Sequence, residues 1–272
     1  MRGVLGKTIA APLVYSPEIL EAIERSASRD QLHFGNLDKI FGADVWHLYE
    51  LSWLERDRGP VSFCGALTIP CDAPATVESK SLKLYLNSLN FHEFPTTEAA
   101  VACISADLSA LTRSEVTLTL IAPVDLAEIT QEIQGELLDT VVPGVVASDV
   151  KPVEGDANAI KVTHQRVAKR WISHNLRSLC PVTGQPDWAT LLIDYEGYAF
   201  DVASLRAYIY SYRTHQEYHE QCVERIFADL LRVAEPTRLT VSAFYLRRGG
   251  IDITPWRSMQ PVSVPLTRTG RQ

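Results

Sequence analysis

The sequence predicts an α+β protein built from two similar halves, each with an antiparallel sheet and two helices packed on one face of that sheet. Two observations carry this prediction. The order strand, strand, helix, helix, strand occurs once in each half of the chain. The letters also match at an offset of 123 residues, because SLKLYL at 81–86 aligns with SLRAYI at 204–209. A repeat of both order and letters indicates duplication of one unit.

The first half opens with a predicted short helix and a predicted β-hairpin. A Ser-Pro pair at 16–17 is typical of an N-cap and a first helical position, so we expect a helix over 17–25. Aromatic and apolar residues are interspersed with polar ones over 45–54, which favours a strand. A turn at 56–60 then leads into a second strand over 61–70, antiparallel to the first.

Two helices and a strand complete the first half. Leu82, Tyr85, Leu86 and Leu89 have the spacing of one helical face, so we expect a helix that begins at Ser81. The remaining expected elements are an alanine-rich helix over 97–111, an alternating strand over 116–121 and a connection over 123–160.

The second half is predicted to repeat this order. Strands are expected over 167–172 and 189–195, with a turn at Glu196 and Gly197. The other expected elements are helices over 202–213 and 216–233 and a strand over 238–246. We place the domain boundary between the halves, which gives an N-terminal module of residues 1–135 and a C-terminal module of residues 136–272.

Composition excludes some classes of partner. The chain has 272 residues, of which 46% are hydrophobic and 22% charged, and this is globular composition with enough material for a core. The net charge of −7 argues against binding to a nucleic-acid backbone, which normally requires a basic face. No apolar run reaches membrane-spanning length, and residues 8–15 are too short and too mixed for a signal peptide, so no membrane partner is expected.

The cysteines indicate a reducing compartment. They are odd in number and form no Cys-x-x-Cys pair, which favours free thiols over a disulfide framework and predicts a cytoplasmic protein. The cysteines are Cys64, Cys71, Cys103, Cys180 and Cys222.

The segment 180–188, CPVTGQPDW, places a cysteine and a carboxylate seven residues apart. Each proline keeps the residue before it extended, and Gly184 allows a bend that can bring Asp187 back toward the sulfur of Cys180. The tryptophan at the end of the segment can shield such a pair from water. A thiol nucleophile beside a proton donor is the simplest chemical interpretation. The structural alternative is a packed thiol and a turn-forming aspartate.

The segment 215–222, HQEYHEQC, offers a competing interpretation as a metal site. His215 and His219 would share a helix face at i and i+4, a spacing of metal ligands, and Cys222 would follow on the same stripe. His215 and Cys222 would lie roughly 10 Å apart along the axis, so one tetrahedral ion cannot easily bind all three. No other His/Cys cluster completes the set, and we therefore expect no metal; a solvated polar helix start is the structural alternative.

Two further segments could hold an anion such as a cofactor phosphate. At 78–81, ESKS, free backbone N–H groups and a lysine stand at a predicted helix start, although ordinary capped helices look the same. At 247–250, RRGG, an arginine fork suits phosphate and paired glycines admit a ligand to the backbone, although a plain strand-ending turn is the alternative. No Gly-x-Gly-x-x-Gly follows a strand, so a Rossmann cofactor site is not supported.

Three segments carry a family resemblance: 180–188 (CPVTGQPDW), 77–85 (VESKSLKLY) and 247–252 (RRGGID). Through them, and in the right order over nearly its whole length, the chain resembles the NADPH-dependent 7-cyano-7-deazaguanine reductases, the nitrile reductases of queuosine biosynthesis. The resemblance is to the long, two-module form of that family. It implies that each half is a tunnelling-fold module, that ligands bind where modules meet and that the chain forms a homodimer.

The resemblance also implies the chemistry. A nitrile carbon reacts slowly with hydride, and addition of the Cys180 thiolate converts the nitrile to a thioimidate, which divides one hard step into easier ones. Asp187 would protonate the developing nitrogen as general acid. One NADPH then reduces the thioimidate, the thiolate leaves to give an imine, and a second NADPH yields 7-aminomethyl-7-deazaguanine for tRNA modification. The tRNA itself is not expected to bind.

The resemblance assigns further residues to each ligand. Those implied for the substrate, a small deazapurine nitrile, are Val77, Glu78, Ser79, His219 and Glu220. Those implied for NADPH are Ser79, Lys80, Arg248 and Gly249. His219 joins Cys180 and Asp187 among the catalytic residues, because it is expected near the reacting group.

Three other functions stay open from the sequence. A hydrolase that uses Cys180 with His219 as base would release ammonia or acid without consuming NADPH. A zinc-dependent pterin-type enzyme built on His215 and His219 would contain bound metal and be sensitive to chelators. A purine-binding module without chemistry would keep its ligand affinity in a Cys180→Ala variant.

Overall fold

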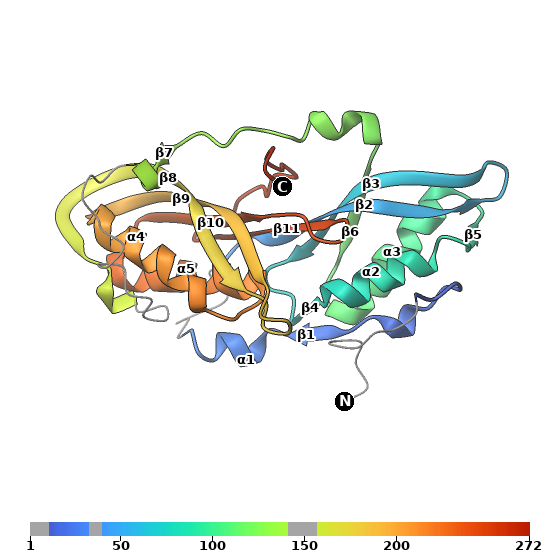
Figure 1. The fold of residues 1–272 in the computed structure, drawn as a ribbon, viewed down its shortest axis with the longest axis horizontal. Coiled ribbons are helices and arrows are strands. Elements are labelled where there is room, and N and C mark those ends of the chain that lie inside the picture. Colours follow the sequence, from blue (N-terminus) through green and yellow to red (C-terminus); the bar gives the residue numbers. More distant parts are fainter. Residues whose placement is uncertain (1–10, 33–39, 141–156) are drawn as a thin grey trace.

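The computed structural model describes residues 11–32, 40–140 and 157–272, and its mixture of antiparallel strands and few helices is the α+β class that the sequence predicts (Figure 1). The strands are β1 (Ala22–Glu24), β2 (Ala43–Glu55), β3 (Gly59–Pro70), β4 (Ala75–Val77), β5 (Glu93–Phe94), β6 (Thr117–Ile121), β7 (Glu136–Leu137), β8 (Val162–Leu179), β9 (Pro186–Phe200), β10 (Arg238–Tyr245) and β11 (Ile251–Ser258). The α-helices are α1 (Ser26–Arg29), α2 (Ser79–Ser88), α3 (Thr97–Thr112), α4 (Val202–Ser211) and α5 (His219–Ala234).

The long strands join into one main sheet. Its strands follow the order β6-β3-β2-β11-β10-β9-β8-β7, with β5 beside β2, and a separate two-stranded sheet pairs β1 with β4. The long helices lie on one face of the main sheet, with α2 and α3 under β2 and β3, and α4 and α5 under β8 to β10 (Figure 1). The sheet with two helices predicted for each half is therefore present twice, and the two sheets continue into each other.

The first half follows the prediction closely. β2 and β3 form the expected antiparallel hairpin, and β6 pairs antiparallel with β3. The apolar face predicted for the helix that begins at Ser81 is buried in α2, where Leu82 and Tyr85 are fully inaccessible to solvent. Burial of such a stripe against a sheet is what stabilises an amphipathic helix in a folded protein.

The second half has longer strands than predicted, and the turn expected at Glu196 and Gly197 is wrong. Both residues lie inside β9 and pair with residues of the neighbouring strands. The glycine is needed for space, because a Cβ at position 197 would lie 2.4 Å from the hydroxyl oxygen of Tyr195. That hydroxyl donates a hydrogen bond to the carbonyl of Tyr198. A glycine inside a strand can therefore mark a close contact instead of a bend.

The helices of the second half are present with shifted ends. The first ends at Ser211 and is followed by a 3-10 turn over Tyr212–Thr214. The second begins at His219, with Tyr218 as its N-cap, and not at residue 216. This shift matters for the metal interpretation, because His215 then lies outside the helix.

β11 was not predicted, although it joins the two halves. It pairs antiparallel with β10 on one side and with β2 on the other. All eight of its residues are buried. Pro255 and the charged Arg257 conceal the strand in the sequence, since proline removes a donor from the ladder and buried arginines are rare.

The N-terminal helix predicted over 17–25 is wrong. The chain forms one 3-10 turn over Pro17–Ile19 and then the strand β1, which pairs antiparallel with β4. The side chain of Ser16 makes no capping hydrogen bond and donates instead to the carbonyl of Val14. Pairing with β4 satisfies the backbone groups of this segment, so tertiary contacts override the local helix signal.

The predicted connection over 123–160 contains only short elements where the structure describes it. Besides β7, these are 3-10 turns over Pro123–Ala127, Leu138–Thr140 and Ala157–Ala159, and residues 141–156 lie outside the described part. Within the described residues, no helix is long and apolar enough to cross a membrane.

Buried apolar side chains form a core under each half of the sheet. One cluster gathers residues of the second half around Tyr195, Tyr208 and Phe227. The other gathers residues of the first half around Trp46, Trp53 and Tyr85, together with Ile251 and Ile253 of β11. The division into modules 1–135 and 136–272 stays a proposal, in which β11 belongs to the second module and packs into the core of the first.

Candidate active site

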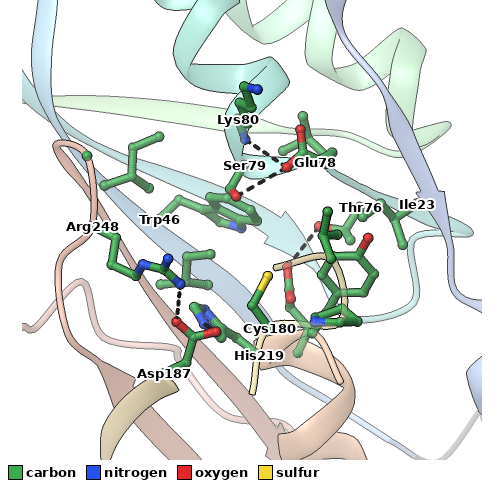
Figure 2. A pocket seen from close by; sticks show the side chains of 18 of the residues that line it. Ile23, Trp46, Thr76, Glu78, Ser79, Lys80, Cys180, Asp187, His219 and Arg248 are labelled. Atoms are coloured by element: carbon green, nitrogen blue, oxygen red, sulfur yellow. Dashed lines mark hydrogen bonds and ion pairs between the residues drawn. The ribbon is translucent and has the colours of Figure 1, made fainter. Parts of the chain in front are cut away.

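A cavity of about 390 Å³ lies where the two halves meet, between the β4–α2 connection, the β8–β9 loop, the start of α5 and the β10–β11 turn (Figure 2). A volume in this range suits a small-molecule ligand. The structure brings together every residue that the sequence assigned to catalysis or to a ligand. Those that line the cavity are Val77, Glu78, Ser79, Lys80, Cys180, Asp187, His219, Glu220, Arg248 and Gly249.

Cys180 follows the last residue of β8 and opens the loop into β9. Its N–H donates to the carbonyl of Gln185 at 2.8 Å, and Gly184 N–H donates to the carbonyl of Cys180 at 2.9 Å. Gly184 has φ of +66°, so the bend predicted at this glycine is confirmed. The thiol is free and partly exposed, and its sulfur points into the cavity (Figure 2). The loop therefore presents the sulfur to a ligand on a fixed backbone.

Asp187 is buried and has two partners, a histidine and an arginine. Its Oδ2 lies 3.3 Å from Nε2 of His219, and its Oδ1 accepts a hydrogen bond from Nη1 of Arg248. Burial by itself would raise the pKa of Asp187, but the hydrogen bond and charge of His219, and then those of Arg248, outweigh it and hold the pKa below its usual value. In this state Asp187 is a carboxylate, so a role as general acid requires that a proton first reach it.

His219 is the first residue of α5 and is held by stacking. Its ring lies parallel to that of Tyr245, with centroids 3.8 Å apart and planes 9° apart. Its Nδ1 is buried and has no hydrogen-bond partner among the described residues. The stack and the contact with Asp187 fix the orientation of the ring, so one nitrogen faces the carboxylate and the other is left unpaired.

Two buried carboxylates face the cavity from opposite halves. Glu220 accepts a hydrogen bond from the hydroxyl of Thr76 at 3.2 Å. Glu78 is the N-cap of α2 and accepts from the backbone N–H groups of Lys80 at 2.9 Å and Ser81 at 2.7 Å. The helix-start N–H groups that the sequence analysis offered to an anion are therefore occupied by the chain's own carboxylate.

The β10–β11 turn carries Arg248 and Gly249. Gly249 and Gly250 both have positive φ, at 59° and 80°. Nζ of Lys83 donates to the carbonyl of Gly249 at 2.6 Å and lies 3.1 Å from a carboxylate oxygen of Glu50. A Cβ at position 250 would lie 2.4 Å from Cδ of Glu50, the end of an exposed side chain that can move, so the turn needs glycine for its conformation. Arg248, half exposed, also reaches the side chain of Gln185.

The histidine pair of the metal interpretation does not converge. Nε2 of His215 lies 2.8 Å from Glu217, whereas Nε2 of His219 faces Asp187. The idea of a shared helix face was wrong, because α5 begins only at His219.

A different cluster brings possible ligand atoms of His215, Glu217 and Cys222 within 4.8 Å of one another. Arg225 already binds both carboxylate oxygens of Glu217, and burial raises the pKa of the Cys222 thiol. A cluster with a neutralised carboxylate and a thiol that resists ionisation does not suit a cation. The expectation of no metal stays a prediction.

Sequence reasoning missed several residues that line the cavity. Thr76 and Trp46 come from β-strands, and Tyr218 stands next to His219. Of these three residues, only Tyr218 lies in a segment that the sequence analysis singled out, the polar segment 215–222. Trp188 is not among the described residues that line the cavity, and its ring packs beneath Arg213, with the guanidinium 4.9 Å from the ring centroid. Shielding of the Cys180–Asp187 pair by this tryptophan stays a prediction.

The fold and the site define an α+β enzyme whose cavity combines a cysteine thiol, an acid–imidazole pair and two buried carboxylates. Residues 12–120 match the family model described as nitrile reductase, 7-cyano-7-deazaguanine-reductase N-term, and residues 186–262 match the model described as QueF-like protein. The chain belongs to the family of NADPH-dependent 7-cyano-7-deazaguanine reductases, as its resemblance to that family predicts.

Named relatives agree over nearly the full length. The NADPH-dependent 7-cyano-7-deazaguanine reductase of Acinetobacter baylyi is 42% identical over 274 residues, which cover 98% of this chain and 98% of that protein. The protein of the same name from Coxiella burnetii is 40% identical over 271 residues, which cover 98% of this chain and 96% of that protein.

Proposed function

We propose that this chain reduces the nitrile of 7-cyano-7-deazaguanine to the amine of 7-aminomethyl-7-deazaguanine with two NADPH, through a thioimidate on Cys180. The observation that carries the proposal is the position of the Cys180 sulfur in the cavity that also holds the Asp187–His219 pair and the carboxylates Glu78 and Glu220. Membership of the family supports the substrate and the cofactor.

In the first step, the Cys180 sulfur forms a bond to the nitrile carbon and one carbon–nitrogen π bond breaks. The nitrogen gains the electron pair and takes a proton, which leaves a neutral thioimidate. We propose that the proton arrives through the hydrogen bond between His219 and Asp187, because Asp187 alone is held as a carboxylate in the free protein.

The purine-like ring is proposed to lie between the carboxylates of the two halves. A guanine-type edge presents N–H donors, and a buried carboxylate that accepts from them discriminates strongly against ligands without them. Glu220 lines the cavity and its Oε1 accepts a hydrogen bond from the Thr76 hydroxyl, which holds the carboxylate in place to accept from a ligand. Val77 and Ser79 complete this wall of the cavity.

NADPH would be held along the rim formed by Ser79, Lys80, Arg248 and Gly249. The fit is supported by exposed cationic groups at this rim, where Lys80 and Lys83 stand at the start of α2 and Arg248 is half exposed. A second hollow of about 300 Å³ shares Lys83 and Gly249 with the main cavity, which leaves room for a ligand longer than the substrate. When bound, NADPH supplies the two hydrides of the reaction.

The remaining parts of the proposal concern partners and location. We propose a homodimer in the cytoplasm that binds neither nucleic acid nor membrane and that supplies 7-aminomethyl-7-deazaguanine for queuosine modification of tRNA. The net charge of −7 supports the absence of nucleic-acid binding.

Intact-mass spectrometry tests the covalent step. The protein is mixed with 7-cyano-7-deazaguanine without NADPH, beside Cys180→Ala and the control Cys103→Ala, whose thiol lies outside the cavity. We expect an adduct of the whole substrate mass in the parent and the control, none in Cys180→Ala, and its discharge by NADPH. Ligand binding without an adduct would overturn the thioimidate, and ammonia release without NADPH oxidation would favour a hydrolase.

A further inference from the structure

A network of buried charges lies behind the substrate wall of the cavity. It joins two carboxylates to arginines from two segments of the chain, α1 with its N-cap and β11, and most of these side chains are almost fully buried. The members are Arg25, Arg29, Asp44, Glu224 and Arg257.

Asp44 and Glu224 each bind more than one arginine. Asp44 accepts from Arg25 with one oxygen and from Arg257 at 2.8 Å with the other. Glu224 lies 2.7 Å from Arg257, 2.6 Å from Arg29 and 3.6 Å from Arg25. These contacts tie β2, β11, α5 and the segment before α1 together beside the cavity.

The charges of this network do not cancel. Three arginines against two carboxylates leave one positive charge. Glu220 stands one helical turn before Glu224 on α5, so its carboxylate shares the helix face that meets this network. A buried charge without a counter-charge is strongly unfavourable, so an ionised Glu220 and a positive network stabilise each other.

The electrostatic contributions at Glu220 identify the members of the network that act on it. Burial and then Asp44 raise the pKa of Glu220, Arg25 and then His219 oppose this rise, and the pKa of the carboxyl remains above its usual value. The other ionisable groups around it are Glu224 on its own helix, Arg257 on β11, Glu78 at the start of α2 and Tyr218.

Arg25 is poorly satisfied for a residue that only stabilises the fold. Its side chain is 3% exposed, and its Nε has no hydrogen-bond partner among the described residues. An unpaired buried donor lowers stability, and buried ion pairs are by themselves weak evidence of a stabilising role. This arrangement favours a function connected with the cavity.

We propose that Arg25 is a positioning residue for substrate recognition, whose buried guanidinium supplies the counter-charge that keeps Glu220 an acceptor for the N–H edge of the deazapurine. The proposal rests on the proposed function, in which Glu220 binds that edge. It links the N-cap of α1, which carries no residue assigned to the reaction, to the recognition of the substrate. Asp44 belongs to the same network and opposes Arg25, because its negative charge disfavours ionisation of Glu220.

The pH dependence of kcat/KM for the nitrile tests the proposal. Removing Arg25 raises the pKa of Glu220, so the acid limb of the profile moves to higher pH in Arg25→Gln. Removing the charge of Asp44 lowers it, so Asp44→Asn moves the same limb to lower pH. We expect shifts on the order of one pH unit, with kcat/KM of Arg25→Gln roughly tenfold lower on the acid limb and recovering as the pH rises.

Two variants separate positioning from structure. Arg25→Lys keeps the charge and should restore most of the profile. Arg113→Gln removes an exposed arginine that pairs with Glu24, the neighbour of Arg25, and should match the parent. Folding of every variant is checked by circular dichroism, and if Arg25→Gln does not fold, the opposite shift in Asp44→Asn still decides the question.

The outcomes distinguish the inference from the proposed function. If the parent does not reduce the nitrile, the proposed function fails first. If the parent is active and the profiles of Arg25→Gln and Asp44→Asn both coincide with it, or both shift in the same direction, the role of Arg25 is overturned. Loss of activity at every pH in a folded Arg25→Lys would likewise indicate a purely structural role.

Discussion

The two halves of the molecule keep the same internal framework but contribute different parts of the site. In each half a carboxylate caps the first long helix: Glu78 accepts from Ser81 N–H, and Asp201 accepts from Ser204 N–H at 2.8 Å. Both pairs of residues stand at the repeat offset of 123 residues. Each serine also returns its hydroxyl to the carbonyl of the capping residue, at 2.7 and 2.8 Å.

The similarity continues inside the helices. Tyr85 donates to Asp107 at 2.6 Å, and its counterpart Tyr208 donates to Asp229 at 2.7 Å. Contacts of this detail are not required by helix formation, so their presence in both halves supports duplication of one unit.

The difference between the caps shows where function has been added. Glu78 is 4% exposed and lines the cavity, whereas Asp201 is exposed and only caps its helix. The cysteine, Asp187, His219 and Glu220 all belong to the second half. A framework that is repeated therefore supports a site that is not, and a complete cavity needs both halves.

The largest expected contrast between the halves is their response to acid. In the second half, burial opposes ionisation of Glu224, but Arg257, Arg29 and Arg25 outweigh it and lower its pKa to about 2. A folded-state pKa below the ordinary glutamate value of 4.5 contributes stability that is present above that pH and is lost as the pH falls toward 2, amounting to roughly 3 kcal/mol.

Asp187 and Glu217, also in the second half, have lowered pKa values of the same sign, because histidine and arginine partners outweigh their burial. In the first half, the described carboxylates with lowered pKa are Glu24 and Glu98, which are exposed, so their pKa shifts carry little stability. Hydrogen exchange read by peptide at pH 7 and pH 3.5 should show the second half losing protection first. Equal loss in both halves, or an unchanged pH dependence in Glu224→Gln, would contradict this assignment.

The next contrast concerns the capping carboxylates. Glu78→Gln removes a charged acceptor from the cavity, and a lost hydrogen bond to a charged group should lower kcat/KM for the nitrile by roughly 10- to 100-fold. Asp201→Asn is the matched control at the same position of the other half, and its kinetics should equal those of the parent. Steady-state NADPH oxidation measures both. If the two variants lose activity equally, Glu78 acts on the fold and not on the substrate.

How far the sequence predicts this molecule can be judged from particular residues. Local signals sufficed for the hairpin of β2 and β3, for the buried face of α2 and for the bend at Gly184, because each depends on neighbours in sequence. The resemblance to a known family assigned residues from segments far apart in the chain to one site, and all of them line the same cavity in the structure.

What the sequence could not predict depends on contacts between distant segments. β11 contains Pro255 and Arg257, which are unusual in a buried strand. It forms a strand because it pairs with β2 on one side and with β10 on the other. The buried position of Arg25 likewise needs Asp44, which only the assembled fold brings to it. Neither partnership has a local signature in sequence. The spacing of His215 and His219 likewise suggested a shared helix face, but α5 begins only at His219.

A smaller effect is expected for the repeated tyrosines. Tyr85→Phe and Tyr208→Phe each remove one buried hydrogen bond to an aspartate, which should lower the free energy of unfolding by about 1 kcal/mol in each case. Urea denaturation measures the change, and NADPH oxidation should be unaffected because neither residue lines the cavity. Unequal losses would show that the halves have diverged in stability as well as in chemistry.

The smallest expected effect is the loss of a helix cap without function. Asp201→Ala removes the acceptor for Ser204 N–H on an exposed helix start, which should cost about 1 kcal/mol or less of stability and leave nitrile reduction at the parental rate. Denaturation and steady-state kinetics on the same preparation measure the two quantities. We therefore expect the cap at Asp201 to be dispensable for the chemistry. A kinetic defect in Asp201→Ala would instead show that the repeated framework of the second half contributes to the site.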